Sequence, residues 1–147
     1  MDLYTRKLEV INDSFRKLLE IKKESPSFHD YDNSWRSKDI TERNLHKVIE
    51  AIVDIGKMLI SDKKLREPGN NREVFIILSE NSLFPSEHLP LIEKMSGMRN
   101  ILVHSYDRVD DSIVYGVLQK NLKDIKKMNN YFKKLVSEII KRKVRKR

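Results

Sequence analysis

The 147-residue sequence contains no cysteine and only four glycines and four prolines. Without thiols, disulfides, thiolate metal sites and cysteine catalysis are excluded, and the absence fits the reducing cytoplasm where we expect the protein. So few glycines and prolines argue against the many turns of a β-sandwich or barrel. No run of about 18 apolar residues is present, and residues 1–23 are charged throughout, so we expect neither a membrane span nor a signal peptide.

The positive charge of the sequence is concentrated at one end. The formal net charge is +8, but the segment Lys141–Arg147 alone carries six positive charges, which leaves +2 for the rest. The tail is consistent with a helix end, where cations interact well with the helix dipole, and with sequence-independent attraction to RNA phosphates. The length and the 39% apolar content predict one domain, residues 1–147, with an ordinary core.

Apolar residues recur every three or four positions along five segments, which predicts amphipathic helices and no strands. The segments span about residues 3–22, 39–61, 72–80, 86–105 and 110–140. We expect an all-α fold, an antiparallel bundle of four main helices plus one short helix. Gly56 lies inside the second segment, where glycine costs about 1 kcal/mol relative to alanine. The close approach of a neighbouring helix would explain that glycine.

Three local features set the expected boundaries of these helices. Asp39 and Glu42 have the spacing of a capping box, which predicts that the second helix begins at Asp39. The preceding segment, Phe28–Lys38, holds three aromatic rings without periodicity, so we expect an ordered loop that packs within the chain or against another subunit. Ser86 is a suitable N-cap for the fourth helix.

The segment Met98–Tyr106 carries the strongest functional signal. Arg99 keeps its charge at any working pH and offers a planar fork of donors that suits phosphate oxygens. His104 can take and return a proton near pH 7. Asn100 can position a hydroxyl or fix the imidazole tautomer. These residue types could support attack of a ribose 2′-OH on its own phosphodiester, with His104 as base and Arg99 stabilising the charge on phosphorus.

The spacing of Arg99 and His104 sets a geometric condition. On an ideal helix, five residues separate the two positions by about 140° around the axis. The two side chains converge only if the helix ends between them or if two chains share the site. The other histidines, His29, His46 and His88, have no histidine three or four residues away, so we expect surface residues and no metal site.

At this point the sequence resembles a known family. Arg99, Asn100, His104 and Tyr106 match the Arg-x4-His-x-Tyr signature of the HepT toxins, a branch of the HEPN superfamily. The segments that agree further are Glu42-Arg43, Val53–Gly56, Met98–Tyr106 and Val109-Asp110. The similarity runs from about Leu3 to Ile140, and it leaves out the aromatic segment 28–38 and the basic tail.

The resemblance implies a HEPN-like helical dimer whose two motifs face each other across a cleft. It implies a metal-independent endoribonuclease that uses no cofactor and leaves a 2′,3′-cyclic phosphate. It also implies a partner, a nucleotidyltransferase antitoxin of the MntA type, which transfers AMP from ATP to the motif tyrosine. Carried over, Arg99 and His104 are expected to be catalytic, Asn100 supporting and Tyr106 the AMPylation site.

Two interpretations without catalysis remain open from the sequence. The same dimer could be a scaffold and substrate for the nucleotidyltransferase, since no acid is evident to protonate the leaving 5′ oxygen. The second interpretation is a regulatory bundle that uses Arg99 to bind a free nucleotide. The presence of His104 favours the ribonuclease, because neither alternative needs a group that transfers protons.

Overall fold

The structure is a computed structural model that describes the backbone of residues 2–104 and 110–145, and the side chains of residues 2–98 and 110–145. These residues form seven α-helices and one short 3-10 helix, without strands, so the predicted all-α fold is confirmed. In the described ranges, no helix is both long and apolar enough to cross a bilayer.

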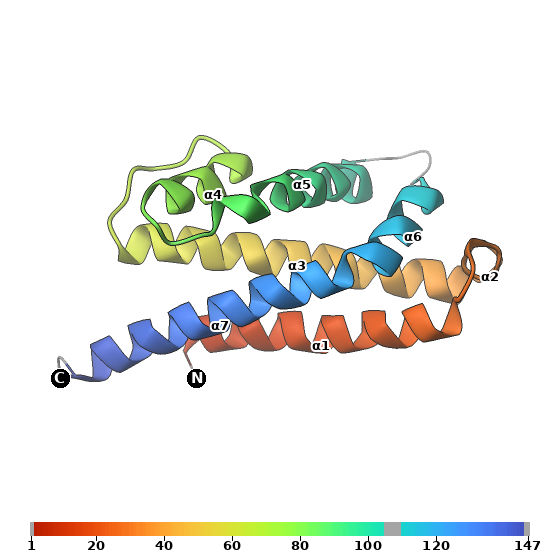
Figure 1. The fold of residues 1–147 in the computed structure, drawn as a ribbon, viewed down its shortest axis with the longest axis horizontal. Coiled ribbons are helices and arrows are strands. Elements are labelled where there is room, and N and C mark those ends of the chain that lie inside the picture. The colour runs from red at the N-terminus through yellow and green to blue at the C-terminus, as the bar shows by residue number, and fades with distance from the viewer. Residues whose placement is uncertain (1, 105–109, 146–147) are drawn as a thin grey trace.

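Two long antiparallel helices, α1 (Leu3–Glu24) and α3 (Trp35–Asp62), form the base of the bundle (Figure 1). The third long helix, α7 (Leu122–Arg145), packs along α1. The apolar stripe of each helix is buried in a common core. Residues with almost no solvent exposure include Ile11 and Leu18 on α1, Ile52 and Ile55 on α3, and Phe132 on α7.

Polar contacts hold α1 and α3 together at the end of the bundle where both chain termini lie. The Tyr4 hydroxyl donates a hydrogen bond of 2.7 Å to the Asp62 carboxylate. Burial, and then this carboxylate, raise the pKa of Tyr4 far above its ordinary value. Lys7 and Asp54 form an ion pair of 2.8 Å one turn further along. These contacts fix the register of the two helices.

The aromatic segment is helical, so the predicted loop is wrong. Residues Phe28–Asp32 form α2, and α3 begins at Trp35 instead of Asp39. The Ser27 and Ser34 side chains accept hydrogen bonds from the backbone N–H groups of Asp30 and Ser37, and they thereby cap α2 and α3. Because Ser34 caps the helix, Asp39 and Glu42 lie inside it and form no capping box.

The second half of the chain also differs from the expected boundaries. Ser86 begins a 3-10 turn, Ser86–His88, and α5 follows as Leu89–His104. The final segment is two helices, α6 (Asp111–Lys120) and α7, separated at Asn121. The Asn121 side chain forms hydrogen bonds with Asp124 and with Lys94 of α5. Such side-chain bonds of asparagine compete with a continuous helix.

Gly56 confirms the expected close approach of a helix. The neighbour is α4 (Asn71–Glu80), and a Cβ atom at Gly56 would lie 2.6 Å from Val74 Cγ1. Val74 is fully buried and β-branched, so it has little freedom to move away.

We therefore expect Gly56→Ala to lower the free energy of unfolding by about 1–2 kcal/mol, since overpacking exceeds the gain in helix propensity. The matched control is Gly116→Ala in α6, where an added Cβ meets nothing within 4 Å. That variant should be as stable as the original or more so. Chemical denaturation of the three proteins measures the difference, and equal stability of both variants would contradict this packing.

Candidate functional site

The backbone of Arg99, Asn100 and His104 lies in the last two turns of α5, which ends at His104. Their side chains, and all of Tyr106, lie outside the described residues. The position of the motif is therefore defined by the helix that carries it and by the elements packed around the end of that helix.

The register between α5 and α3 gives the level of the motif. The two helices contact each other and run antiparallel, as Figure 1 shows. A small internal space between them is lined by Ile49, Ile52, Val53, Ile92, Met95 and Ser96. Both helices rise by about 1.5 Å per residue. Continued along α5, this register brings the backbone of Arg99 to the level of His46, and that of His104 to the level of Thr41 and Glu42.

The helix does not end between Arg99 and His104. Because α5 continues to His104, the two backbone positions are separated by about 140° around its axis. The first of the two geometric conditions, an early helix end, is therefore not met. Convergence of Arg99 and His104 at one site then requires the second condition, a site shared by two chains.

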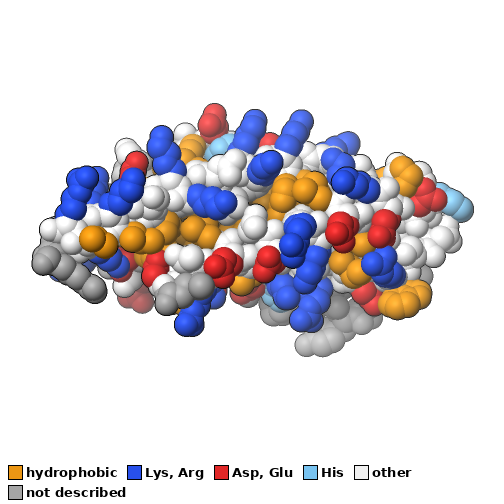
Figure 2. All heavy atoms as spheres, turned by 90° about the horizontal axis from the view of Figure 1, so that it is seen from below, with side chains coloured by type: hydrophobic (Ala, Val, Ile, Leu, Met, Phe, Trp, Pro, Cys, Tyr) orange, Lys and Arg blue, Asp and Glu red, His pale blue; other side chains and the backbone are white. Residues whose placement is uncertain are grey.

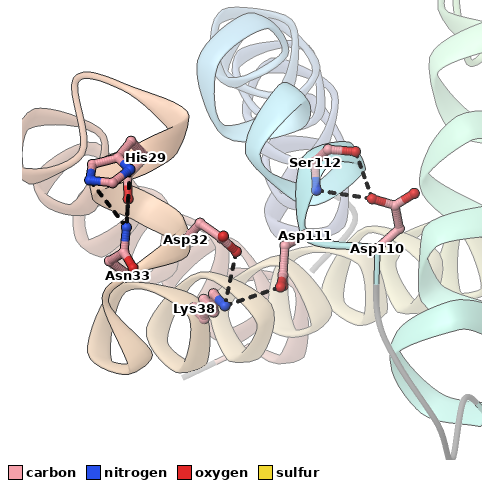
Figure 3. Close-up of polar contacts among 7 residues, drawn as sticks. All are labelled: His29, Asp32, Asn33, Lys38, Asp110, Asp111 and Ser112. Atoms are coloured by element: carbon pink, nitrogen blue, oxygen red, sulfur yellow. Dashed lines mark hydrogen bonds and ion pairs between the residues drawn. The ribbon is translucent and has the colours of Figure 1, made fainter.

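An ion-pair network organises the elements next to the motif level. Lys38 on α3 contacts Asp32 of α2 at 3.1 Å and Asp111 of α6 at 3.2 Å (Figure 3). Hydrogen bonds to Asp32 and then to Asp111 raise the pKa of Lys38. The neighbouring Asp110 caps α6 by accepting from the Ser112 N–H and hydroxyl, and these bonds lower its pKa. The network fixes the start of α6, where the chain re-enters the described fold after α5.

Glu42 lies at the level of His104 and has no hydrogen bond or ion pair within the described part of the chain. Its side chain is partly buried. Burial, followed by the charges of Asp111 and Asp39, raises the pKa of Glu42, and Lys38 only partly offsets this. The carboxyl group is therefore easier to protonate in the folded protein than in the unfolded chain.

The aromatic residues of α2 and α3 divide between core and surface. Tyr31 is fully buried, and its ring packs against Tyr115 with the centroids 5.3 Å apart. The Tyr115 hydroxyl donates to the Ser25 carbonyl, which ties α6 to the end of α1. Trp35 is 77% exposed and Phe28 is 41% exposed. Packing within the chain is thus confirmed for Tyr31, whereas packing of Trp35 against another subunit stays a prediction.

The histidines outside the motif serve structural contacts. The His29 ring accepts a hydrogen bond from the Asn33 amide Nδ2 at the end of α2, as Figure 3 shows, and His46 lies 3.7 Å from Glu50. His88 packs against the Phe84 ring and is 19% exposed, so it reaches the surface only in part. No three His, Asp or Glu side chains in the described ranges are grouped as metal ligands would be.

Neither the Lys38 network nor the environment of Glu42 was predicted from the sequence. Lys38 and Asp111 are far apart in the chain, and each alone is an ordinary surface charge. The one available signal was the Asp110-Asp111 pair directly after the motif, since two adjacent acids at a helix start need a cap or a cation.

An all-α bundle that carries an Arg-x4-His sequence at the end of an internal helix defines the class of HEPN proteins. A sequence model described as "Ribonuclease HepT-like" matches residues 11–132. The chain therefore belongs to the ribonuclease HepT-like family.

Curated relatives agree over nearly the full length. The chain is 33% identical to the tRNA nuclease HepT of Aphanizomenon flos-aquae, over 90% of this chain and 91% of that protein. It is 26% identical to the mRNA nuclease HepT of Shewanella oneidensis, over 90% of this chain and 97% of that protein.

Solved structures show the same fold. The tri-AMPylated Shewanella oneidensis HEPN toxin, in complex with an MNT antitoxin, superimposes with a TM-score of 0.79 at 26% identity. The match covers 90% of this chain and 98% of that chain. The predicted HEPN-like architecture and the resemblance to HepT toxins are confirmed.

The environment of Glu42 predicts a pH-dependent effect on stability. Its raised pKa means that the carboxylate destabilises the folded state once the pH is above that pKa, and that this cost vanishes below the unfolded value of about 4.3. Glu42→Gln should raise the melting temperature at pH 7, on the order of 1–3 °C. The difference should shrink as the pH falls towards 4.5.

The control for this prediction is Glu9→Gln on the exposed face of α1, whose melting temperature should equal that of the original protein at each pH. Thermal unfolding followed by circular dichroism between pH 4.5 and 7.5 measures the three curves. A Glu42→Gln protein that melts below the original at pH 7 would show that the carboxylate stabilises the fold.

Proposed function

We propose that this protein is a metal-independent endoribonuclease toxin, neutralised by a nucleotidyltransferase antitoxin. The observation that carries the proposal is the complete Arg99-Asn100-x3-His104-x-Tyr106 sequence at the end of α5, in a chain that belongs to the ribonuclease HepT-like family. Relatives over most of its length are named tRNA and mRNA nucleases, which supports RNA as substrate class.

The proposed chemistry needs one base, one acid and one stabilising cation. His104 takes the proton of the ribose 2′-OH, and O2′ attacks the adjacent phosphorus while the bond from phosphorus to O5′ breaks. Arg99 stabilises the charge that develops on the phosphoryl oxygens, and Asn100 orients the reacting groups. A proton transferred to O5′ completes the reaction, which leaves a 2′,3′-cyclic phosphate and a free 5′-OH.

The acid of this reaction is assigned to His104 of a second subunit. The helical backbone from Arg99 to His104 supports a site shared by two chains, because one helix presents these positions about 140° apart. A homodimer that brings two α5 ends together supplies two imidazoles, one neutral and one protonated. Dimerisation is then part of the mechanism.

The proposed regulation acts on Tyr106. Transfer of AMP from ATP to its hydroxyl places a bulky phosphate group two residues from His104, and this excludes an RNA phosphate by volume and by repulsion. The similar Shewanella oneidensis toxin, which is tri-AMPylated and in complex with an MNT antitoxin, supports this partner and this modification.

A second candidate is a dimeric scaffold without activity that serves the nucleotidyltransferase, with Arg99 holding a nucleotide. The partly buried Glu42 and the Lys38 network supply charged groups at this end of the bundle, which a binding module also needs. The candidates differ in one outcome, cleavage of RNA.

The ribonuclease proposal predicts RNA cleavage by purified protein in excess EDTA, with products that end in 2′,3′-cyclic phosphate. Arg99→Ala and His104→Ala should each lower the rate by roughly 10²–10⁴-fold. The control is His29→Ala, an exposed histidine of α2, which should cleave at the original rate.

Gel electrophoresis with chemical identification of the product ends measures these rates. Cleavage by His104→Ala at the original rate would remove its role as base. Absence of cleavage by every form would favour the scaffold.

The regulation predicts a mass increase of one or more AMP units after incubation with the partner nucleotidyltransferase and ATP. Peptide mapping should place the increase on Tyr106, and Tyr106→Phe should remain unmodified and active. Tyr131→Phe, a change on α7, serves as the control and should be modified like the original. AMP found on any other residue, or RNA cleavage unchanged by the modification, would contradict this regulation.

A further inference from the structure

A polar groove runs between α1 and α3 near the level of the motif. It consists of two adjoining spaces of about 470 and 420 Å³, and both are lined by Lys17 of α1 and Arg43 of α3. Lys47 lines the larger space one helical turn beyond Arg43. Figure 2, which views the molecule from the side of α1, shows Lys and Arg side chains spread over this face, with a group of them gathered together.

The charges along the groove fall into neutralised and free groups. Lys7 is paired with Asp54 at 2.8 Å, and Arg36 with Glu24 at 2.8 Å. In the part of the chain that the structure describes, Lys17, Arg43 and Lys47 have no such carboxylate. Lys17 therefore faces Arg43 and Lys47 across the larger space, and none of the three is paired with a carboxylate within the described ranges.

Acidic residues elsewhere along the groove limit its positive charge to the region around Lys17, Arg43 and Lys47. In the larger space Asp13 contacts Arg16, and Glu50 contacts His46. The smaller space also holds Glu20 and Asp39. An anion in the groove is therefore attracted to the Lys17, Arg43 and Lys47 end.

The chemistry of the lining favours phosphates over bases. The described side chains around the larger space are charged, small or aliphatic except for the His46 imidazole, which lies 3.7 Å from Glu50, and they include no Phe, Tyr or Trp on which a base could stack. Phosphate contacts alone position a nucleic acid without reading its sequence. A free nucleotide or a base-specific site would need a ring or a set of directed acceptors.

The position of the three cations relates them to the motif. Arg43 and Lys47 lie on the stretch of α3 that the register places beside Arg99 and His104, since the motif backbone lies at the level of residues 41–46. A polynucleotide held at the end of α5 can therefore continue over α3 into the groove.

We propose that Lys17, Arg43 and Lys47 form a phosphate-binding subsite for the RNA chain outside the scissile linkage. The inference rests on the proposed ribonuclease function, because it names how that substrate is held. It assigns no catalytic role to the three residues.

The test measures RNA binding by the full chain with the inactivating change His104→Ala, so that the RNA stays intact. The groove variant adds Lys17→Gln, Arg43→Gln and Lys47→Gln. Its control adds Lys126→Gln, Lys127→Gln and Lys133→Gln on the exposed face of α7, which removes the same charge. Fluorescence anisotropy with a labelled single-stranded RNA of about twenty nucleotides gives Kd as a function of salt concentration.

The groove variant should bind roughly tenfold or more weakly at about 50 mM salt, and the slope of log K against log salt should decrease by about 2, since each lost phosphate contact contributes about 0.7. The control should keep most of the affinity and slope. Equal losses in both proteins would show a general charge effect and overturn the subsite. Full affinity of the groove variant would also overturn it. If the triple change lowers the melting temperature, Arg43→Gln alone should still reduce the slope by about 0.7.

Cleavage kinetics with His104 intact separate this inference from the proposed function. The groove variant should show a higher KM for long RNA and an unchanged rate on a dinucleotide, which is too short to reach the groove. If the original protein cleaves neither substrate, the ribonuclease proposal fails, whereas the anisotropy still decides the subsite. Loss of antitoxin binding by the groove variant with unchanged RNA affinity would identify the groove as a protein interface and overturn the proposal.

Discussion

The packing of α1 against α3 is the interaction on which the rest of the structure depends. The two helices bury complementary apolar stripes, and polar contacts from Tyr4 to Asp62 and from Lys7 to Asp54 fix their register. Two further layers are placed on α3: α4 through the space left at Gly56, and α5 through the apolar contact around Ile49 and Val53. The level of the motif is therefore a consequence of the register along one long helix.

Charged and polar side chains gather at the end of the bundle that carries the motif. Lys38 links three helices through Asp32 and Asp111, and the partly buried Glu42 feels the charges of Asp111 and Asp39. Buried hydroxyl or amide oxygens of Tyr31, Thr41 and Asn44 also lack hydrogen-bond partners among the described residues. Such an arrangement lowers local stability, and proteins retain it most often where a function needs polar groups.

The sequence predicted those parts of the fold that arise from local periodicity. The amphipathic stripes of α1, α3, α4 and α7 and the meaning of Gly56 were correct, because apolar spacing and the cost of a helical glycine are local properties. The errors lie at helix boundaries. Ser27 and Ser34 cap helices in the segment that was predicted to be a loop, and Asn121 divides the last predicted helix into two. Capping competition of this kind cannot be decided from composition alone.

The candidate site was predictable only in its residue types. Arg99, Asn100, His104 and Tyr106 follow from one short segment, whereas the level of that segment on α3 follows from tertiary packing. The cations of the groove come from α1 and α3, and each is an ordinary surface residue in the sequence. Which lysines are neutralised and which are free depends on carboxylates brought close by the fold, as Asp54 is to Lys7.

Both ends of the described chain lie at the pole of the bundle opposite α2 and α6 (Figure 1). The cationic end of α7 contacts Asp62 there, and the electrostatic influence of an exposed charge extends only about 10 Å at ordinary ionic strength. The terminal cations thus act on a region remote from α2 and α6, and their field does not reach across the bundle. A fluorophore or affinity tag attached at either terminus would likewise leave the opposite pole sterically open.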